Sequence, residues 1–172
     1  MLNEKMEEAI NEQINKEMYS SYLYLAMSAY SSAKGLPGFA HWFRIQVEEE
    51  TIHAMKFFDY LNRQGANVKL KEIQKPPMEF GTPLEMFKKT LEHEQFITRS
   101  IHELVDLAIA EKDHATNAFL QWYVNEQIEE EENDNDIIAK LNLVGDNINS
   151  LYMLDNELAQ RLPPQPATQG NA

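Results

Sequence analysis

Residues 48–53 read Glu48-Glu49-Glu50-Thr51-Ile52-His53 and place a carboxylate three residues before a histidine. On an α-helix, Glu50 and His53 would lie on the same face, about one turn apart. A carboxylate and an imidazole arranged in this way can bind one metal ion together. Because single Glu-x-x-His matches are common by chance, the residues on either side decide whether this is a ligand pair.

The helical stripe through Glu50 is otherwise apolar. At helical spacing its members are Phe39, Phe43, Val47, Glu50, Ala54, Phe57 and Leu61, with His53 beside Ala54. This period is that of a helix facing a core, where a buried carboxylate costs several kcal/mol unless a partner compensates it. The alternative is a Glu50 side chain that turns to solvent or pairs with a buried cation, but no Lys or Arg lies on this stripe.

The composition favours one all-α domain with a core of its own. The chain has 172 residues, with few glycines and prolines. It has no cysteine, which excludes disulfides and thiolate ligands. Its net charge of −13 argues against a nucleic-acid partner and is compatible with the attraction of cations. No apolar run approaches the ~20 residues that span a bilayer, and the charged residues 1–8 do not look like a secretory signal. We therefore expect a cytoplasmic protein with no membrane partner.

The sequence predicts four long helices and a short fifth. Three starts carry N-cap residues: Asn3, the capping box Thr82-Pro83-Leu84-Glu85, and Asp113. The expected helices cover about residues 3–33, 37–64, 82 to the turn before 113, 113–145, and 147–161. We expect residues 1–162 to form one domain and residues 163–172 to be a disordered tail.

The link over residues 65–82 shows little helical periodicity. The helix before it, at about 27 residues, would be roughly 40 Å long, and an extended link of this length reaches up to about 60 Å. The link can therefore run the whole length of a bundle. This predicts a four-helix bundle with one long crossover between the second and third helices, plus a short fifth C-terminal helix, which is the ferritin-like arrangement.

The fifth helix carries its own apolar stripe, made of Ile148, Leu151, Leu154 and Leu158. A four-helix bundle alone cannot bury that stripe fully. We therefore expect the chain to form a closed shell, with this helix near a symmetry axis.

Each long helix brings potential metal ligands to mid-height of its inward stripe. In chain order they are Glu17, then Glu50 with His53, then Glu94, then Gln127 with Glu130. Four carboxylates carry four negative charges, which two divalent ions would neutralise. Carboxylates with one imidazole and no sulfur favour iron or manganese over a structural zinc site.

Five runs resemble the non-haem ferritins of the bacterial and archaeal type, over about residues 3–161. They are residues 19–25 (YSSYLYL), 38–43 (GFAHWF), 50–57 (ETIHAMKF), 111–116 (EKDHAT) and 125–131 (NEQIEEE). The resemblance implies a homo-oligomeric hollow cage of 24 subunits. Such a cage oxidises Fe(II) with O2 or H2O2 and stores the iron as a ferric mineral.

The resemblance also implies the roles of individual residues. The ferroxidase set maps onto Glu17, Glu50, His53, Glu94, Gln127 and Glu130. The first iron lies between Glu17 and His53, and Glu50 bridges to a second iron held by Glu94 and Glu130. A nearby tyrosine maps onto Tyr24, and a possible third iron site onto Glu49, Glu126, Glu129 and Glu130.

The sequence differs from bacterioferritins and from animal light-chain ferritins at residues that bind metal, haem or mineral in those families. Bacterioferritins carry a second Glu-x-x-His where this chain has Gln127-x-x-Glu130, and a haem-ligating Met where it has Thr51. We therefore expect no haem. Ile52 and Met55 replace two glutamates of the mineral-nucleating cluster of animal light-chain ferritins, which puts that cluster in doubt.

Other histidines and other functions carry less weight. Glu111 and His114 repeat the Glu-x-x-His spacing but straddle a predicted helix end, so we expect turn chemistry there. His41, His93 and His102 lack a same-face carboxylate at mid-core.

The alternative functions are a di-iron oxidase or peroxidase without storage, and a catalytically silent cage subunit.

Overall fold

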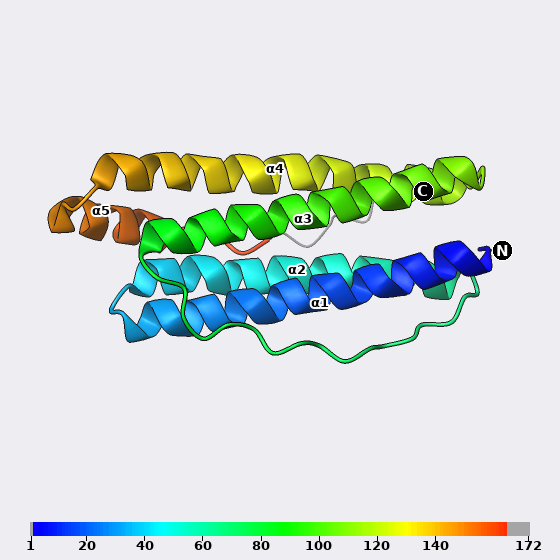
Figure 1. Cartoon of the computed structure of the whole chain (residues 1–172), viewed down its shortest axis with the longest axis horizontal. Coiled ribbons are helices and arrows are strands. Elements are labelled where there is room, and N and C mark those ends of the chain that lie inside the picture. Colours follow the sequence, from blue (N-terminus) through cyan, green and yellow to red (C-terminus); the bar gives the residue numbers. More distant parts are fainter. Residues whose placement is uncertain (1, 165–172) are drawn as a thin grey trace.

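The structure is a computed structural model that describes residues 2–164, and the regular secondary structure there consists of helices without strands. The helices are α1 (Glu4–Ala33), α2 (Pro37–Arg63), α3 (Pro83–Ala110), α4 (His114–Val144) and α5 (Ile148–Leu158). α1 packs along α2 and α3 along α4 to form the bundle, and the link after α2 runs along its outside to the opposite end (Figure 1). This confirms the predicted four-helix bundle with one long crossover. Of the tail predicted over residues 163–172, residues 163 and 164 are described and lie outside the helices, whereas residues 165–172 lie outside the described residues.

The predicted helix starts are confirmed by their caps. The Asn3 side chain accepts a hydrogen bond from the Met6 N–H at 2.8 Å, and Thr82 opens α3 with a complete capping box. The Asp113 side chain accepts from the Thr116 N–H at 3.0 Å. Each cap satisfies a backbone donor that the first helical turn leaves free.

α2 starts differently, because its N-cap residue Leu36 makes no side-chain hydrogen bond. The Asp155 carboxylate, from α5, accepts from the backbone N–H groups of Gly38 at 2.8 Å and Phe39 at 3.0 Å. An added Cβ at Gly38 would lie 1.7 Å from the Asp155 carbonyl oxygen. Glycine at this position therefore lets α5 dock against the start of α2, where a buried anion stabilises the helix end.

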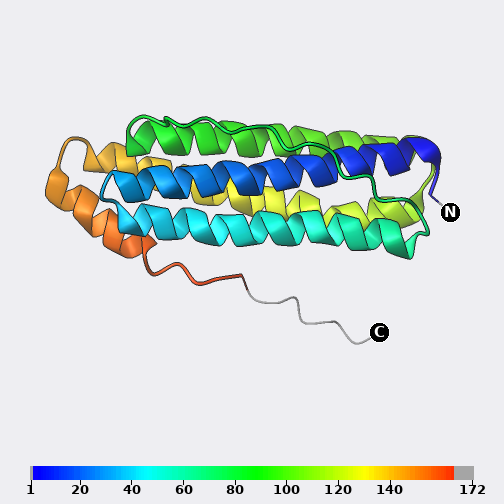
Figure 2. The same cartoon turned by 90° about the horizontal axis from the view of Figure 1, so that it is seen from below.

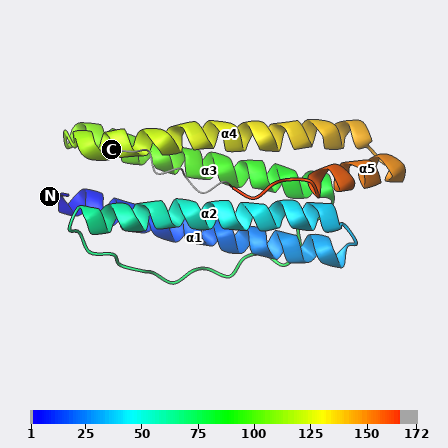
Figure 3. The same cartoon turned by 180° about the vertical axis from the view of Figure 1, so that it is seen from behind.

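α5 ends at Leu158, three residues before its predicted end near Arg161. The chain then turns back along α2 (Figures 2 and 3), where His41 Nε2 donates to the Arg161 carbonyl oxygen at 2.9 Å. The bundle buries Leu154 and Leu158, whereas Ile148 stays 80% exposed. One bundle thus covers only part of the α5 stripe.

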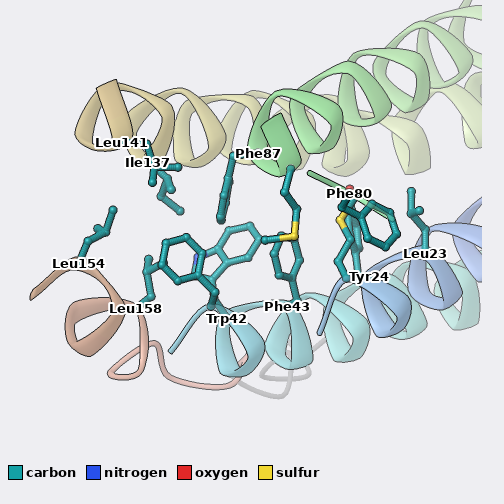
Figure 4. Packing of buried hydrophobic residues seen from close by; sticks show 13 residues of the cluster. Leu23, Tyr24, Trp42, Phe43, Phe80, Phe87, Ile137, Leu141, Leu154 and Leu158 are labelled. Atoms are coloured by element: carbon teal, nitrogen blue, oxygen red, sulfur yellow. The ribbon is translucent and has the colours of Figure 1, made fainter. Parts of the chain in front are cut away.

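The apolar core is divided into two clusters, one toward each end of the bundle. The cluster at the α5 end includes Phe43, Phe87, Ile137 and Leu158 (Figure 4). The cluster at the other end includes residues from the first turns of α1 and the last turns of α2, such as Met6 and Leu61. Between the clusters, all four long helices carry buried polar residues at the same height. Among the helices of residues 2–164, none combines the length and the hydrophobicity that a membrane span requires.

Candidate metal centre

The four carboxylates predicted to meet in the core are buried between the two apolar clusters. Glu17, Glu50 and Glu94 are each 1% exposed, and Glu130 is 6% exposed. Ligand atoms of Glu17, Glu50 and His53 all lie within 4.8 Å of one another. The His53 Nδ1 atom is 3.6 Å from Glu50 Oε2. The predicted helical face therefore brings α1 and α2 together around one point.

The α3 and α4 half of the centre is held by hydrogen bonds. Gln127 Nε2 donates to Glu94 Oε2 at 3.2 Å, and the Tyr24 hydroxyl donates to Glu94 Oε1. The amide nitrogen of Gln46 reaches both Glu50 Oε1, at 3.2 Å, and Glu130 Oε2, at 2.9 Å. One nitrogen thus lies between the carboxylates of the two halves.

Burial dominates the electrostatics of the centre. Desolvation, followed by the charge of Glu50, raises the pKa of Glu17 to about 8 and that of Glu94 to about 8. Desolvation and the charge of Glu94 raise the pKa of Glu130 to about 8. The pKa of Glu50 is raised well above its ordinary value, first by desolvation and then by the charge of Glu130. At neutral pH the metal-free centre holds protons that cations could replace.

The residues of the centre fit a divalent cation such as iron. The Oε2 atom of Glu17 is buried and has no hydrogen-bond partner within residues 2–164, so it lacks the compensation that a buried oxygen normally has. The other potential metal ligands of the centre are carboxylate oxygens and one imidazole nitrogen, a set that suits iron. His53 is held in place from two sides. The Tyr123 hydroxyl donates to the His53 carbonyl oxygen at 2.7 Å, and the His53 ring packs edge-on against Trp122.

The comparisons with known proteins agree with this geometry. A family model described as ferritin-like domain matches residues 7–144. The chain belongs to the ferritin family. It is 44% identical over 161 residues to a bacterial non-heme ferritin of Bacteroides fragilis, covering 94% of this chain and all of the relative. A bacterial non-heme ferritin of Campylobacter jejuni is 44% identical over 155 residues, covering 90% of this chain and 93% of the relative.

Solved ferritin structures share the fold along nearly the whole chain. The open pore ferritin of the hyperthermophilic archaeon Archaeoglobus fulgidus superposes with a TM-score of 0.93 at 50% identity, covering 94% of this chain and all of that one. A closed form of the same archaeal ferritin, engineered by mutagenesis, gives 0.94 at 49% identity over 95% of this chain and all of that one. The family and the ferritin fold inferred from the sequence are thus confirmed.

Around this ferritin centre lie two buried glutamines that the sequence analysis did not single out. Gln13 and Gln46 are each 1% exposed, and each stands four residues before a predicted ligand. Gln13 Nε2 donates to Glu17 Oε1 at 2.8 Å, as Gln46 does to Glu50. The repeated Gln-x-x-x-Glu spacing on two helices was the signal available, because residues at i and i+4 face each other.

Asp134 is a further buried acid, one turn after Glu130 on α4. It is 1% exposed, and its Oδ2 atom has no hydrogen-bond partner within the described chain. Desolvation, then the charges of Glu94 and Glu130, raise its pKa well above the ordinary value. It adds a fifth carboxyl group to the polar layer.

The residues expected at a third iron site are spread over a more open surface. Glu49 and Glu126 are half-buried and Glu129 is exposed. Within residues 2–164, the only trio whose ligand atoms converge within 4.8 Å is Glu17, Glu50 and His53. Glu49 is instead paired with Arg161 Nη2 at 2.5 Å.

The remaining histidines have other partners. Glu111 ends α3 and accepts hydrogen bonds from Asn3 and Lys5, each at 3.1 Å, so the Glu111/His114 motif lies in a turn as expected. His93 Nε2 lies 2.8 Å from the Ser20 hydroxyl, and His102 is exposed.

Proposed function

We propose that this chain is the subunit of an iron-storage ferritin that oxidises Fe(II) inside the bundle. The observation that carries the proposal is the convergence of Glu17, Glu50 and His53 within 4.8 Å at a layer that Glu94 and Glu130 complete. In this proposal Glu50 bridges two Fe(II) ions, and Gln127 lies beside the second. A cytoplasmic location is part of the proposal.

Iron binding and proton release are coupled in this account. Glu17, Glu94 and Glu130, each with a pKa of about 8, hold protons at neutral pH, and two Fe(II) ions displace them. Each Fe(II) then gives one electron to the oxidant, O2 or H2O2. Two electrons and two protons reduce O2 to H2O2, and two electrons reduce H2O2 to two hydroxide ions. Tyr24 holds one Glu94 oxygen through its hydroxyl while the other oxygen faces Gln127.

Substitution of Glu50 or His53 tests this activity. We expect Glu50→Ala and His53→Ala to slow the initial stopped-flow rate of Fe(II) oxidation by about 10-fold or more, because each removes a ligand. The matched controls are Glu48→Ala and His102→Ala, which alter exposed residues. Wild-type rates in either centre variant would remove the basis of the proposal and favour a catalytically silent subunit.

The proposed assembly is a closed cage of 24 subunits. It is supported by the ferritin relatives and by the large apolar side chains that α5 leaves uncovered: Ile148 is 80%, Tyr152 67% and Met153 72% exposed. A second copy of the chain would bury such a surface. Analytical ultracentrifugation at neutral pH, with and without iron, should show one large species. A monomer or dimer under both conditions would contradict the cage.

We further propose a weaker third iron site at Glu49, Glu126, Glu129 and Glu130, on the face between α2 and α4. Its support is electrostatic proximity. Burial raises the pKa of Glu49, and the charge of Glu126 adds to this rise against the opposing charges of Arg161 and His53. Replacement of Glu49, Glu126 and Glu129 together by Ala should spare two-iron binding but change the iron oxidised per O2 consumed. Unchanged stoichiometry, together with only two irons per chain in anomalous diffraction, would rule the site out.

A further inference from the structure

Arg161, in the segment that follows α5, makes a set of contacts with α2 beside the metal centre. Its Nη1 atom donates to Gln46 Oε1 at 2.8 Å and to the Trp42 carbonyl oxygen at 3.3 Å. Its Nη2 atom pairs with Glu49 at 2.5 Å. The guanidinium carbon lies 4.3 Å from the centre of the Trp42 ring. A planar cation with this many partners has a fixed orientation.

The contact with Gln46 determines which way the amide of Gln46 points. Its oxygen accepts from Arg161, so its N–H2 group must face Glu50 and Glu130, to which it donates at 3.2 and 2.9 Å. The reverse orientation would set the amide oxygen against two carboxyl groups and the N–H2 group against a guanidinium. Because Gln46 is 1% exposed, water cannot compensate for that orientation.

The same arrangement occurs independently on the opposite face of the bundle. Lys16 Nζ donates to the Ser100 hydroxyl at 2.5 Å, and that hydroxyl donates to Gln13 Oε1 at 2.5 Å. The Gln13 Nε2 atom then donates to Glu17 at 2.8 Å. On both faces a cation fixes the oxygen of a buried glutamine whose N–H2 group faces a ligand carboxylate.

We propose that Arg161 and Gln46 form a positioning pair for the di-iron centre, in which the C-terminal segment orients Glu50 and Glu130 without contacting either. The inference rests on the proposed function, in which Glu50 and Glu130 bind iron. Outer partners of metal ligands typically change metal affinity about 10- to 100-fold when they are removed.

Anaerobic titration with Co(II), followed by its visible absorption, tests the pair without relying on oxidation. We expect Arg161→Gln to weaken the site built on Glu50 and Glu130 by about 10-fold and to change its spectrum. Gln46→Ala should do the same, and the double variant should be no weaker than the worse single variant, because both remove one interaction. Arg161→Lys should restore part of the affinity, since an ammonium group can still donate a hydrogen bond to Gln46 Oε1.

The matched control is Lys140→Gln, which breaks the 2.6 Å ion pair between α4 and Glu157 of α5 at the surface. It should leave Co(II) binding unchanged. Wild-type Co(II) binding in Arg161→Gln, or fully additive losses in the double variant, would overturn the positioning role. If the wild-type chain binds Co(II) but does not oxidise Fe(II), the proposed function fails while the positioning pair is still tested.

Discussion

Asp134→Asn should stabilise the metal-free protein, by an amount that grows with pH. The wild-type carboxyl is buried, lacks a partner at Oδ2 within the described residues, and has a pKa raised well above 3.8 by desolvation and by Glu94 and Glu130. Between pH 3.8 and the raised value, the folded chain keeps a proton that the unfolded chain has lost. Folding then becomes less favourable as pH rises through this window.

The size of the effect follows from this linkage. Each pH unit inside the window removes about 1.4 kcal/mol of the wild type's free energy of unfolding relative to the variant. From pH 5 to pH 7 the advantage of the Asn variant should therefore grow by up to about 3 kcal/mol. Well below pH 3.8 this pH-dependent difference should vanish, because Asp134 is then protonated in both states.

Urea unfolding of chelator-treated protein at several pH values, at one chain concentration, measures this difference. Asp136→Asn is the matched control, because Asp136 is exposed on the same helix, and it should show no such trend. A difference between wild type and Asp134→Asn that stays constant with pH would refute the argument. So would a variant that is less stable than wild type at pH 7.

Two further predictions address the α5 contact and the tyrosine. Gly38→Ala should lower the free energy of unfolding by about 2 kcal/mol or more, because its Cβ would lie 1.7 Å from the Asp155 carbonyl oxygen and force α5 away. Urea unfolding checks this, and unchanged stability would show that α5 is not held there. Tyr24→Phe should slow Fe(II) oxidation while keeping Co(II) affinity within about 10-fold, because Glu94 loses a hydrogen-bond donor but remains a ligand. Stopped-flow rates equal to wild type would contradict this role.

The features predicted correctly from the sequence are those that depend on short-range spacing. The caps at Asn3, Thr82 and Asp113 each involve a residue three positions away. The helical period alone placed Glu50 and His53 on one inward face. The length of the link between the second and third helices predicted the crossover, because an extended segment of that length can run along the whole bundle.

The features that the sequence did not predict depend on contacts between residues far apart in the chain, or on whether one buried oxygen has a hydrogen-bond partner. Arg161 meets Gln46 across 115 positions of sequence, and that contact exists only because the chain turns back after Leu158. Spacing alone could not show whether Asp134 is a metal ligand, a solvated acid or a buried acid without a partner, because Asp134 lies one helical turn after the predicted ligand Glu130. The Asp155 cap on α2 likewise arises from tertiary packing, with no local motif at Leu36.

Iron retention during aerobic loading tests whether this chain stores iron. Fe(II) is added stepwise in air, and iron and protein mass are measured together by size-exclusion chromatography with light scattering. We predict that iron co-elutes with one large assembly at far more than the two ions per chain that the centre would hold, and that Glu50→Ala delays this uptake. Iron that stays at two or fewer per chain, or that precipitates outside the assembly at the rate of a protein-free blank, would contradict storage by this ferritin.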